Sequence, residues 1–144
     1  MYRWLKTLLV LISRFGLAAM WLFAAGAKLY TLHDFAFNLT NLMPERLAMP
    51  VAISVIAAEI MAAVLLCIPR TTRAGAALTA AMLVGFALYG LYYVYVLNGE
   101  PLECGCFGGI IGSQLGVKTA LRNLLLLVPA ALVFFGTPRV RRFE

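Results

Sequence analysis

Four apolar stretches, separated by short polar segments, dominate this sequence and constrain what it can fold into. They cover about residues 7–30, 51–68, 74–97 and 116–135. The hydrocarbon core of a bilayer is about 30 Å thick, and a helix needs about 20 apolar residues to cross it. In lipid every backbone polar group must be paired within the chain, and a helix achieves this. We therefore predict an all-α integral membrane protein, a single domain over residues 1–144 built as a bundle of four transmembrane helices.

The composition agrees with lipid as the main solvent. Hydrophobic residues make up 63% of the chain, and the mean hydropathy is +0.92. An ordinary globular domain is only about 45–50% apolar. Pro50 and Pro69 bracket the second stretch. Because proline suits the first turn of a helix and cannot continue one, both residues predict helix boundaries.

Basic residues gather on one side of the predicted four-span arrangement. That side holds Arg3, Lys6, Arg70, Arg73, Arg139, Arg141 and Arg142. The other side holds Arg46, Lys118, Asp34, Glu45, Glu100 and Glu103. By the positive-inside rule, both termini are cytoplasmic and loops 31–50 and 98–115 face outward from the inner membrane of a bacterium. The asymmetry also explains the net charge of +6 without a nucleic-acid partner.

The second predicted outer loop contains the motif Cys104-Gly105-Cys106. Disulfides persist in oxidising compartments, and glycine permits the bend that such a close pair needs. The ring is very small, and strained, exposed disulfides are the reducible ones. A redox-active pair, with Cys104 and Cys106 as catalytic residues, is therefore favoured over a structural bridge. A metal site is least favoured, because two thiolates need further ligands and His33 is the only histidine in the outer loops, and we predict no metal. Cys67 is predicted to be a small buried apolar residue.

Four ionisable residues fall inside the apolar stretches: Arg14, Lys28, Glu59 and Arg122. Such residues are costly in lipid and usually face a partner or a cavity. From the helical rise, Glu59 and Arg122 lie at similar depths, about 12 Å and 9 Å below the outer ends of their helices. We therefore predict that these two pair. Lys28 either joins them or extends to the outer surface, and Arg14 is expected to reach the cytoplasmic headgroups.

The predicted Glu59–Arg122 pair has two interpretations. The favoured one is a salt bridge that fixes helix packing. The other is a polar site beneath the cysteines that moves protons or binds a quinone headgroup, with Lys28 and Tyr92 as further members. Tyr92 belongs to a tyrosine cluster at the outer end of the third stretch, which is typical of an interfacial aromatic belt. Quinone is thus a candidate cofactor, and no cofactor is certain from the sequence.

The chain resembles the DoxX-like membrane proteins, and within them the group of the methylamine utilisation protein MauE. The resemblance covers nearly the whole chain and rests on motifs that occur in order: Arg14 and Gly16, Ala25-Gly26 with Lys28-Leu29, Phe35, Leu42-Met43-Pro44, Glu59, Asn98-Gly99, Cys104-Gly105-Cys106-Phe107-Gly108 and Arg122-Asn123. It implies a four-helix bundle that works beside thioredoxin-like periplasmic proteins in forming or maintaining disulfides. For the MauE group it implies a link to maturation of the disulfide-rich small subunit of methylamine dehydrogenase. Related DoxX-like proteins are linked to quinone-coupled sulfur oxidation.

The expected function is a membrane thiol–disulfide oxidoreductase. Cys104 and Cys106 would exchange disulfides with a thioredoxin-like extracytoplasmic protein, and the apolar surface would contact membrane lipid. One alternative is a non-enzymatic structural or assembly subunit of a larger membrane complex. A transporter is less favoured, because no inverted repeat is visible. The sequence leaves open the direction of electron flow and which cysteine is the nucleophile.

Overall fold

The computed structural model describes residues 1–96 and 117–138, and the regular structure in these ranges is entirely helical. The helices are α1 (Tyr2–Tyr30), α2 (Leu32–Leu39), α3 (Glu45–Cys67), α4 (Thr72–Tyr95) and α5 (Val117–Gly136). Three of them, α1, α3 and α4, are long and apolar enough to cross a membrane, and the apolar part of α5, Ala120–Gly136, is shorter. The predicted all-helical membrane protein is confirmed, while a fourth crossing by α5 stays a prediction.

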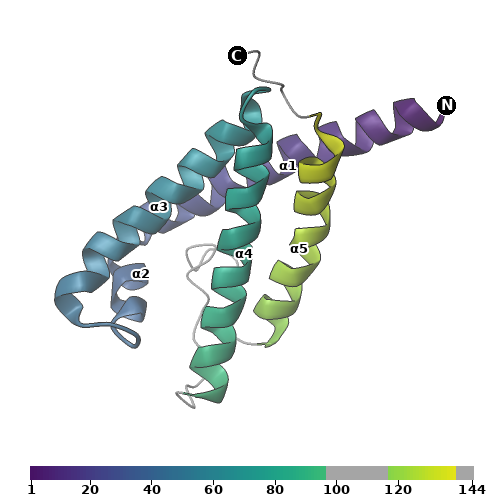
Figure 1. The fold of residues 1–144 in the computed structure, drawn as a ribbon. Coiled ribbons are helices and arrows are strands. Elements are labelled where there is room, and N and C mark those ends of the chain that lie inside the picture. Colours follow the sequence, from purple (N-terminus) through teal and green to yellow (C-terminus); the bar gives the residue numbers. More distant parts are fainter. Residues whose placement is uncertain (97–116, 139–144) are drawn as a thin grey trace, which may run out of the picture.

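The four long helices form a ring of neighbours (Figure 1). Both α3 and α5 pack against α1, and both also pack against α4. The start of α1, the end of α3, the start of α4 and the end of α5 lie toward the top of Figure 1. Successive long helices therefore run in opposite directions, and α3 and α5 lie diagonally across the ring from each other.

Small residues fill much of the space between the helices. The main buried cluster comprises Leu17, Ala18, Trp21, Ala24, Ala62, Ala63, Leu66, Ala76, Leu83, Ala130 and Val133. Small side chains let membrane helices approach closely. The approach is tightest at Gly75 of α4, where an added Cβ would lie 2.7 Å from the backbone nitrogen of Leu66 in α3. Only glycine fits this position without a shift of the backbone.

The short helix α2 was not predicted from the sequence. It lies against the first half of α3, and the two share a second buried cluster of Phe35, Ala36, Leu39, Ala48 and Ala52. The hydroxyl of Tyr89 in α4 donates a hydrogen bond of 3.3 Å to the carbonyl of Asn38. Through these contacts α2 is fixed to the bundle at the end where α1 stops and α3 begins.

The observed bounds differ most from the predicted ones at the start of α3. That helix begins at Glu45, with Pro44 as its N-cap and Pro50 inside it, so the predicted start after Pro50 was wrong. Membrane helices tolerate an internal proline when neighbouring groups accommodate the freed backbone. The end was predicted more closely, because Ile68, just before Pro69, is extended and α3 stops at Cys67. Predicted and observed bounds of α4 and α5 agree within two residues.

Candidate functional site

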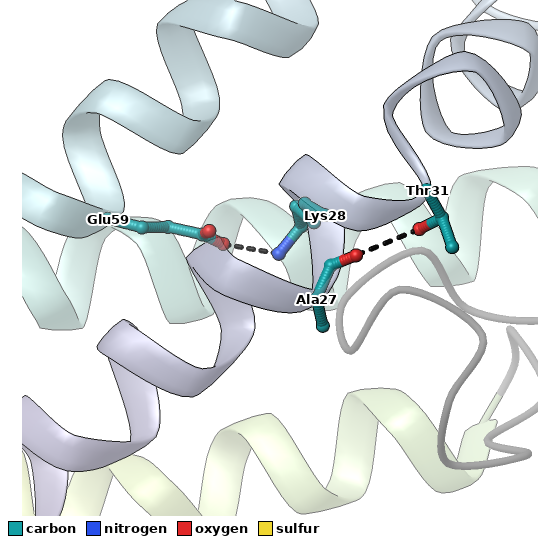
Figure 2. A network of polar contacts seen from close by, with 4 residues as sticks. All are labelled: Ala27, Lys28, Thr31 and Glu59. Carbon is teal, nitrogen blue, oxygen red and sulfur yellow. Dashed lines mark hydrogen bonds and ion pairs between the residues drawn. The ribbon is translucent and has the colours of Figure 1, made fainter.

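A buried ion pair joins two helices near the end of the bundle that carries α2. The ammonium of Lys28, in the last turn of α1, donates to Oε1 of Glu59 in α3. Figure 2 shows the two side chains pointing toward each other between the helices. Both are 0% exposed. Charges in a low-dielectric interior persist when they are paired, and Lys28 and Glu59 pair with each other.

Two aromatic rings flank the Lys28 ammonium. Its Nζ lies 5.6 Å from the ring centroid of Phe35 in α2 and 5.3 Å from that of Phe86 in α4. Both distances are within the range of a cation–π attraction, which is strongest for a desolvated cation. Lys28 therefore brings together α1, α2, α3 and α4 at a single buried charge. Phe86 was not predicted as a site residue from the sequence, although its ring lies beside the ammonium of Lys28.

The carboxylate of Glu59 is only half satisfied. Its Oε1 accepts from Lys28, while its buried Oε2 has no hydrogen-bond partner among the described residues. A buried acceptor without a partner is costly. Such groups in native proteins call for an explanation, often a catalytic role or a bound water. Oε2 of Glu59 is therefore a buried acceptor of this site that calls for an explanation.

Arg122 does not form the predicted ion pair with Glu59, whose ion-pair partner is Lys28. The guanidinium side chain instead lines a small cavity of about 20 Å³ with Trp21 of α1 and Phe86 of α4. The prediction rested on similar depths of Glu59 and Arg122, and the sequence does not give the order of the helices around the ring. Because α3 and α5 are diagonal in the ring, α1 supplies the nearer cation to Glu59.

Tyr92 lies apart from the buried pair. Its side chain is 42% exposed on the surface of α4. Tyr89, one turn earlier, lines an apolar groove of about 380 Å³ between α2, α3 and α4. Phe35 and Phe86 line the same groove. The rings of Phe35 and Phe86 that flank Lys28 thus also line this apolar groove.

Residues 6–136 match the model of one protein family, described as methylamine utilisation protein MauE. The chain belongs to the MauE family. The match spans the ion pair, the groove and the cysteine motif, and it covers most of the chain. Together with the apolar helices it identifies a bacterial membrane protein. No curated protein and no solved structure matches the chain significantly.

The predicted catalytic residues of this MauE-family protein, Cys104 and Cys106, lie outside the described residues. The segment that contains them follows Val96 at the end of α4 and precedes Val117 at the start of α5. Helix α4 ends and helix α5 begins toward the end of the bundle that carries α2 (Figure 1). The redox role of Cys104 and Cys106 stays a prediction. Within residues 1–96 and 117–138, no three His, Cys, Asp or Glu residues are grouped to hold a metal ion.

Cys67, the third cysteine, lies at the opposite end of the bundle. It is exposed, so the prediction that it is buried was wrong. The reason is the rotation of α3: its last turns bury Ala62, Ala63 and Leu66, and Cys67 falls outside that face.

Arg14 has hydrogen-bond partners that the sequence did not predict. Its Nε donates to the carbonyl of Leu66, and its Nη2 donates to the carbonyl of Cys67 at 2.6 Å. The last four carbonyls of a helix have no intrahelical donor and carry the negative end of the helix dipole. Arg14 therefore caps the C-terminus of α3.

Proposed function

We propose that this MauE-family protein is a membrane thiol–disulfide oxidoreductase, with Cys104 and Cys106 as its redox pair. The observation that carries the proposal is the Cys104-Gly105-Cys106 motif between two apolar helices of a MauE-family chain. Its partner is a thioredoxin-like extracytoplasmic protein. The family name connects it to methylamine utilisation. The disulfide-rich small subunit of methylamine dehydrogenase is then the substrate whose bonds this exchange would serve.

The proposed reaction is a reversible disulfide exchange. A thiolate of the pair attacks a disulfide of the partner and forms a mixed disulfide, which the second cysteine resolves. The partner leaves as a dithiol, and Cys104 and Cys106 are left as a disulfide. Two electrons and two protons are transferred in each cycle, and the reverse sequence oxidises the partner instead.

We further propose four spans, cytoplasmic termini and an extracytoplasmic cysteine pair. Arg3 and Arg70 belong to the end of the bundle opposite α2, and the positive-inside rule favours the cytoplasm for that end. A membrane-impermeant maleimide tests this in intact cells. Cys104 and Cys106 should be labelled from outside after reduction, while Cys67 should not. Labelling of Cys67 alone would reverse the orientation.

A quinone is the proposed electron carrier, in the groove lined by Phe35, Phe86 and Tyr89. Ligand sites are usually apolar clefts of about 300–1,000 Å³ with a few polar groups, and this groove falls in that range. When the pair oxidises the partner, Cys104 and Cys106 become a dithiol, and a quinone restores their disulfide by taking two electrons and two protons and leaving as a quinol. When the pair reduces the partner, a quinol restores the dithiol and leaves as a quinone. The ammonium of Lys28 lies beside the rings of Phe35 and Phe86, and Glu59 pairs with it. Arg122 and Tyr92 are further members of the proposed site, although neither lines this groove.

Trapping of a mixed disulfide tests the proposed exchange. Cys104→Ser and Cys106→Ser are each introduced into a Cys67→Ser background, so that one thiol remains. The variant that retains the attacking cysteine should accumulate a mixed disulfide that is lost on reduction, and the variant without any cysteine should not. Absence of a mixed disulfide in both single-thiol variants would refute the exchange.

Filling the groove tests the quinone step separately. Gly85 lines the groove and has nothing within 4 Å of an added Cβ, so the side chain of Gly85→Leu starts from open space and should fill the groove. Gly16→Leu is the matched control, because Gly16 is equally open but lies outside this groove. We expect Gly85→Leu alone to shift the steady-state ratio of dithiol to disulfide in the cysteine pair. An unchanged ratio would exclude the groove as the quinone site and leave the exchange itself untouched.

The complete burial of the Lys28–Glu59 pair favours a second candidate, a structural or assembly subunit of a larger membrane complex. A fully buried ion pair that connects two helices is suited to stabilising their packing. If this candidate is correct, replacing both Cys104 and Cys106 by serine should leave complex assembly intact. If the oxidoreductase is correct, that double variant should lose all exchange while the protein still inserts and folds.

A further inference from the structure

A second groove lies between α1 and α5, at the end of the bundle opposite α2. It has a volume of about 510 Å³. Apolar residues from both helices line it, including Leu9, Leu132 and Phe135. Lys6 is the only charged residue of this lining among the described residues, and Tyr2 lies near it at the start of α1. The groove thus combines a long apolar surface with one cation at its end.

The contact between α1 and α5 explains why a groove forms there. The two helices meet at Gly136, where an added Cβ would lie 2.5 Å from Cγ2 of Val10. Beyond this contact the first turns of α1 project past the end of α5 (Figure 1). The side chains of residues 2–9 are exposed, and no described helix covers the space between them and α5.

The charge of this end of the bundle is entirely positive among the described residues. Arg3, Lys6, Arg70 and Arg73 lie there, whereas Asp34, Glu45 and Glu59 lie at the other end or inside the bundle. The guanidinium of Arg73 is 4.6 Å from the ring centroid of Phe134, next to the groove residue Phe135. The field at the groove therefore favours an anion.

We propose that this groove binds an anionic phospholipid. One acyl chain lies along the apolar lining, and the phosphate lies at the ammonium of Lys6. Basic sites between transmembrane helices bind anionic headgroups, and each nearby cation contributes about fivefold in affinity. A zwitterionic lipid would fill the same apolar space, but its own cation would oppose the field of the four basic residues. This site is separate from the proposed redox site and does not depend on it.

Competition between two lipids with the same acyl chains tests the proposal. Purified protein is mixed with dioleoyl phosphatidylglycerol and dioleoyl phosphatidylcholine, and retained lipid is counted by native mass spectrometry. The protein should retain one phosphatidylglycerol in preference to phosphatidylcholine, by about fivefold or more. Equal retention of the two lipids would overturn the proposal.

Matched variants separate a specific site from general surface charge. Lys6→Gln should reduce the preference by about fivefold. Arg3→Gln removes the same charge from an exposed residue that does not line the groove, and it should cost clearly less. Equal losses would mean that only the surface field attracts the lipid, and the site would be rejected.

Ala131→Phe provides an independent test, because it narrows the groove and leaves every charge in place. Retained phosphatidylglycerol should fall to the level of phosphatidylcholine, with the helical content unchanged by circular dichroism. Undiminished retention would show that the chain does not lie in the groove and would overturn the proposal. If Ala131→Phe lowers the helical content, Leu132→Ala replaces it as the test, and it should weaken lipid retention by removing apolar lining.

Discussion

Two cations of α1 meet their partners toward opposite ends of the bundle, and they are neutralised in different ways. Near one end, Lys28 is fully buried and meets the carboxylate of Glu59. Nearer the other end, Arg14 is only half-buried and meets the backbone carbonyls of Leu66 and Cys67. The first arrangement pairs two full charges, and the second pairs a charge with the end of a helix dipole. A charge in a membrane helix can therefore be stabilised without an acidic partner.

This difference determines how much each cation contributes to the free energy of unfolding. Removing Lys28 leaves the Glu59 charge buried and unpaired, which is the costly case. Removing Arg14 leaves carbonyl groups near the helix end, where water and headgroups can partly replace the lost donors. We therefore expect substitutions at the Lys28 end to have the larger effect on the free energy of unfolding.

The largest expected effect is that of Lys28→Met. It should lower the free energy of unfolding by about 3–5 kcal/mol, as should Glu59→Gln, because each breaks the buried pair from one side. The double variant should lose less than the sum of the two, since no uncompensated charge remains. Unfolding in increasing SDS measures all three. Strictly additive losses would mean that the two residues are not coupled in the membrane.

At the opposite end, Gly75→Ala should destabilise the protein by about 1–3 kcal/mol, the usual cost of overpacking. The new Cβ would lie 2.7 Å from the backbone nitrogen of Leu66, and a backbone atom cannot turn aside as the end of a side chain can. Gly16→Ala is the control, because nothing lies within 4 Å of its added Cβ. The same unfolding assay should find the control neutral or slightly stabilising. Equal effects of the two substitutions would contradict the close contact of α3 and α4.

Arg14→Gln should have a smaller effect, about 1–2 kcal/mol, from the loss of charge-assisted hydrogen bonds to α3. Arg14→Lys should recover part of it, because the charge still complements the dipole while the forked donor geometry is lost. Hydrogen exchange of the last turn of α3 should rise in the same order. If Arg14→Gln lowered the free energy of unfolding as much as Lys28→Met, the proposed difference between the two cations would be wrong.

The smallest expected effect lies between the two ends, where Nε1 of Trp21 donates to Oγ1 of Thr79 at 3.0 Å. Thr79→Val keeps the shape and removes the acceptor. Interhelical hydrogen bonds in membrane proteins contribute about 0.6 kcal/mol on average, so a loss of that order is expected in the unfolding assay. Thr79→Ser should retain the bond. A serine variant as unstable as the valine variant would indicate that packing of the methyl group matters more.

Hydropathy was sufficient to predict the helical membrane fold, because lipid leaves few options for a chain with such long apolar stretches. Pro69 similarly indicated where α3 stops. The short helix α2 escaped prediction because eight residues carry too little pattern, and its position depends on burial of Phe35 and Leu39 against α3. Short connecting elements of this kind are defined by tertiary contacts.

The candidate site was predicted only in part, because its pairing also depends on tertiary contacts. That Glu59 needs a buried partner followed from its position in an apolar stretch, and Lys28 was among the residues considered. The choice of Arg122 rested on depth along the membrane normal, which the sequence supplies. The sequence does not supply the order of the helices around the ring, and this order makes Lys28 the ion-pair partner of Glu59. Phe35 and Phe86 were not selected, because aromatic residues in apolar stretches give no signal that separates a cation-binding ring from ordinary packing.

The redox midpoint of the Cys104–Cys106 pair tests the central claim most directly. Membranes containing the Cys67→Ser variant are equilibrated across a series of glutathione ratios, and free thiols are then alkylated and resolved by gel shift. Cys104 and Cys106 should change together from dithiol to disulfide, with a midpoint well above the value of about −300 mV below which structural disulfides lie. A pair that stays oxidised in strong reductant would indicate a structural bridge. Two thiols that never pair at any ratio would contradict the oxidoreductase outright.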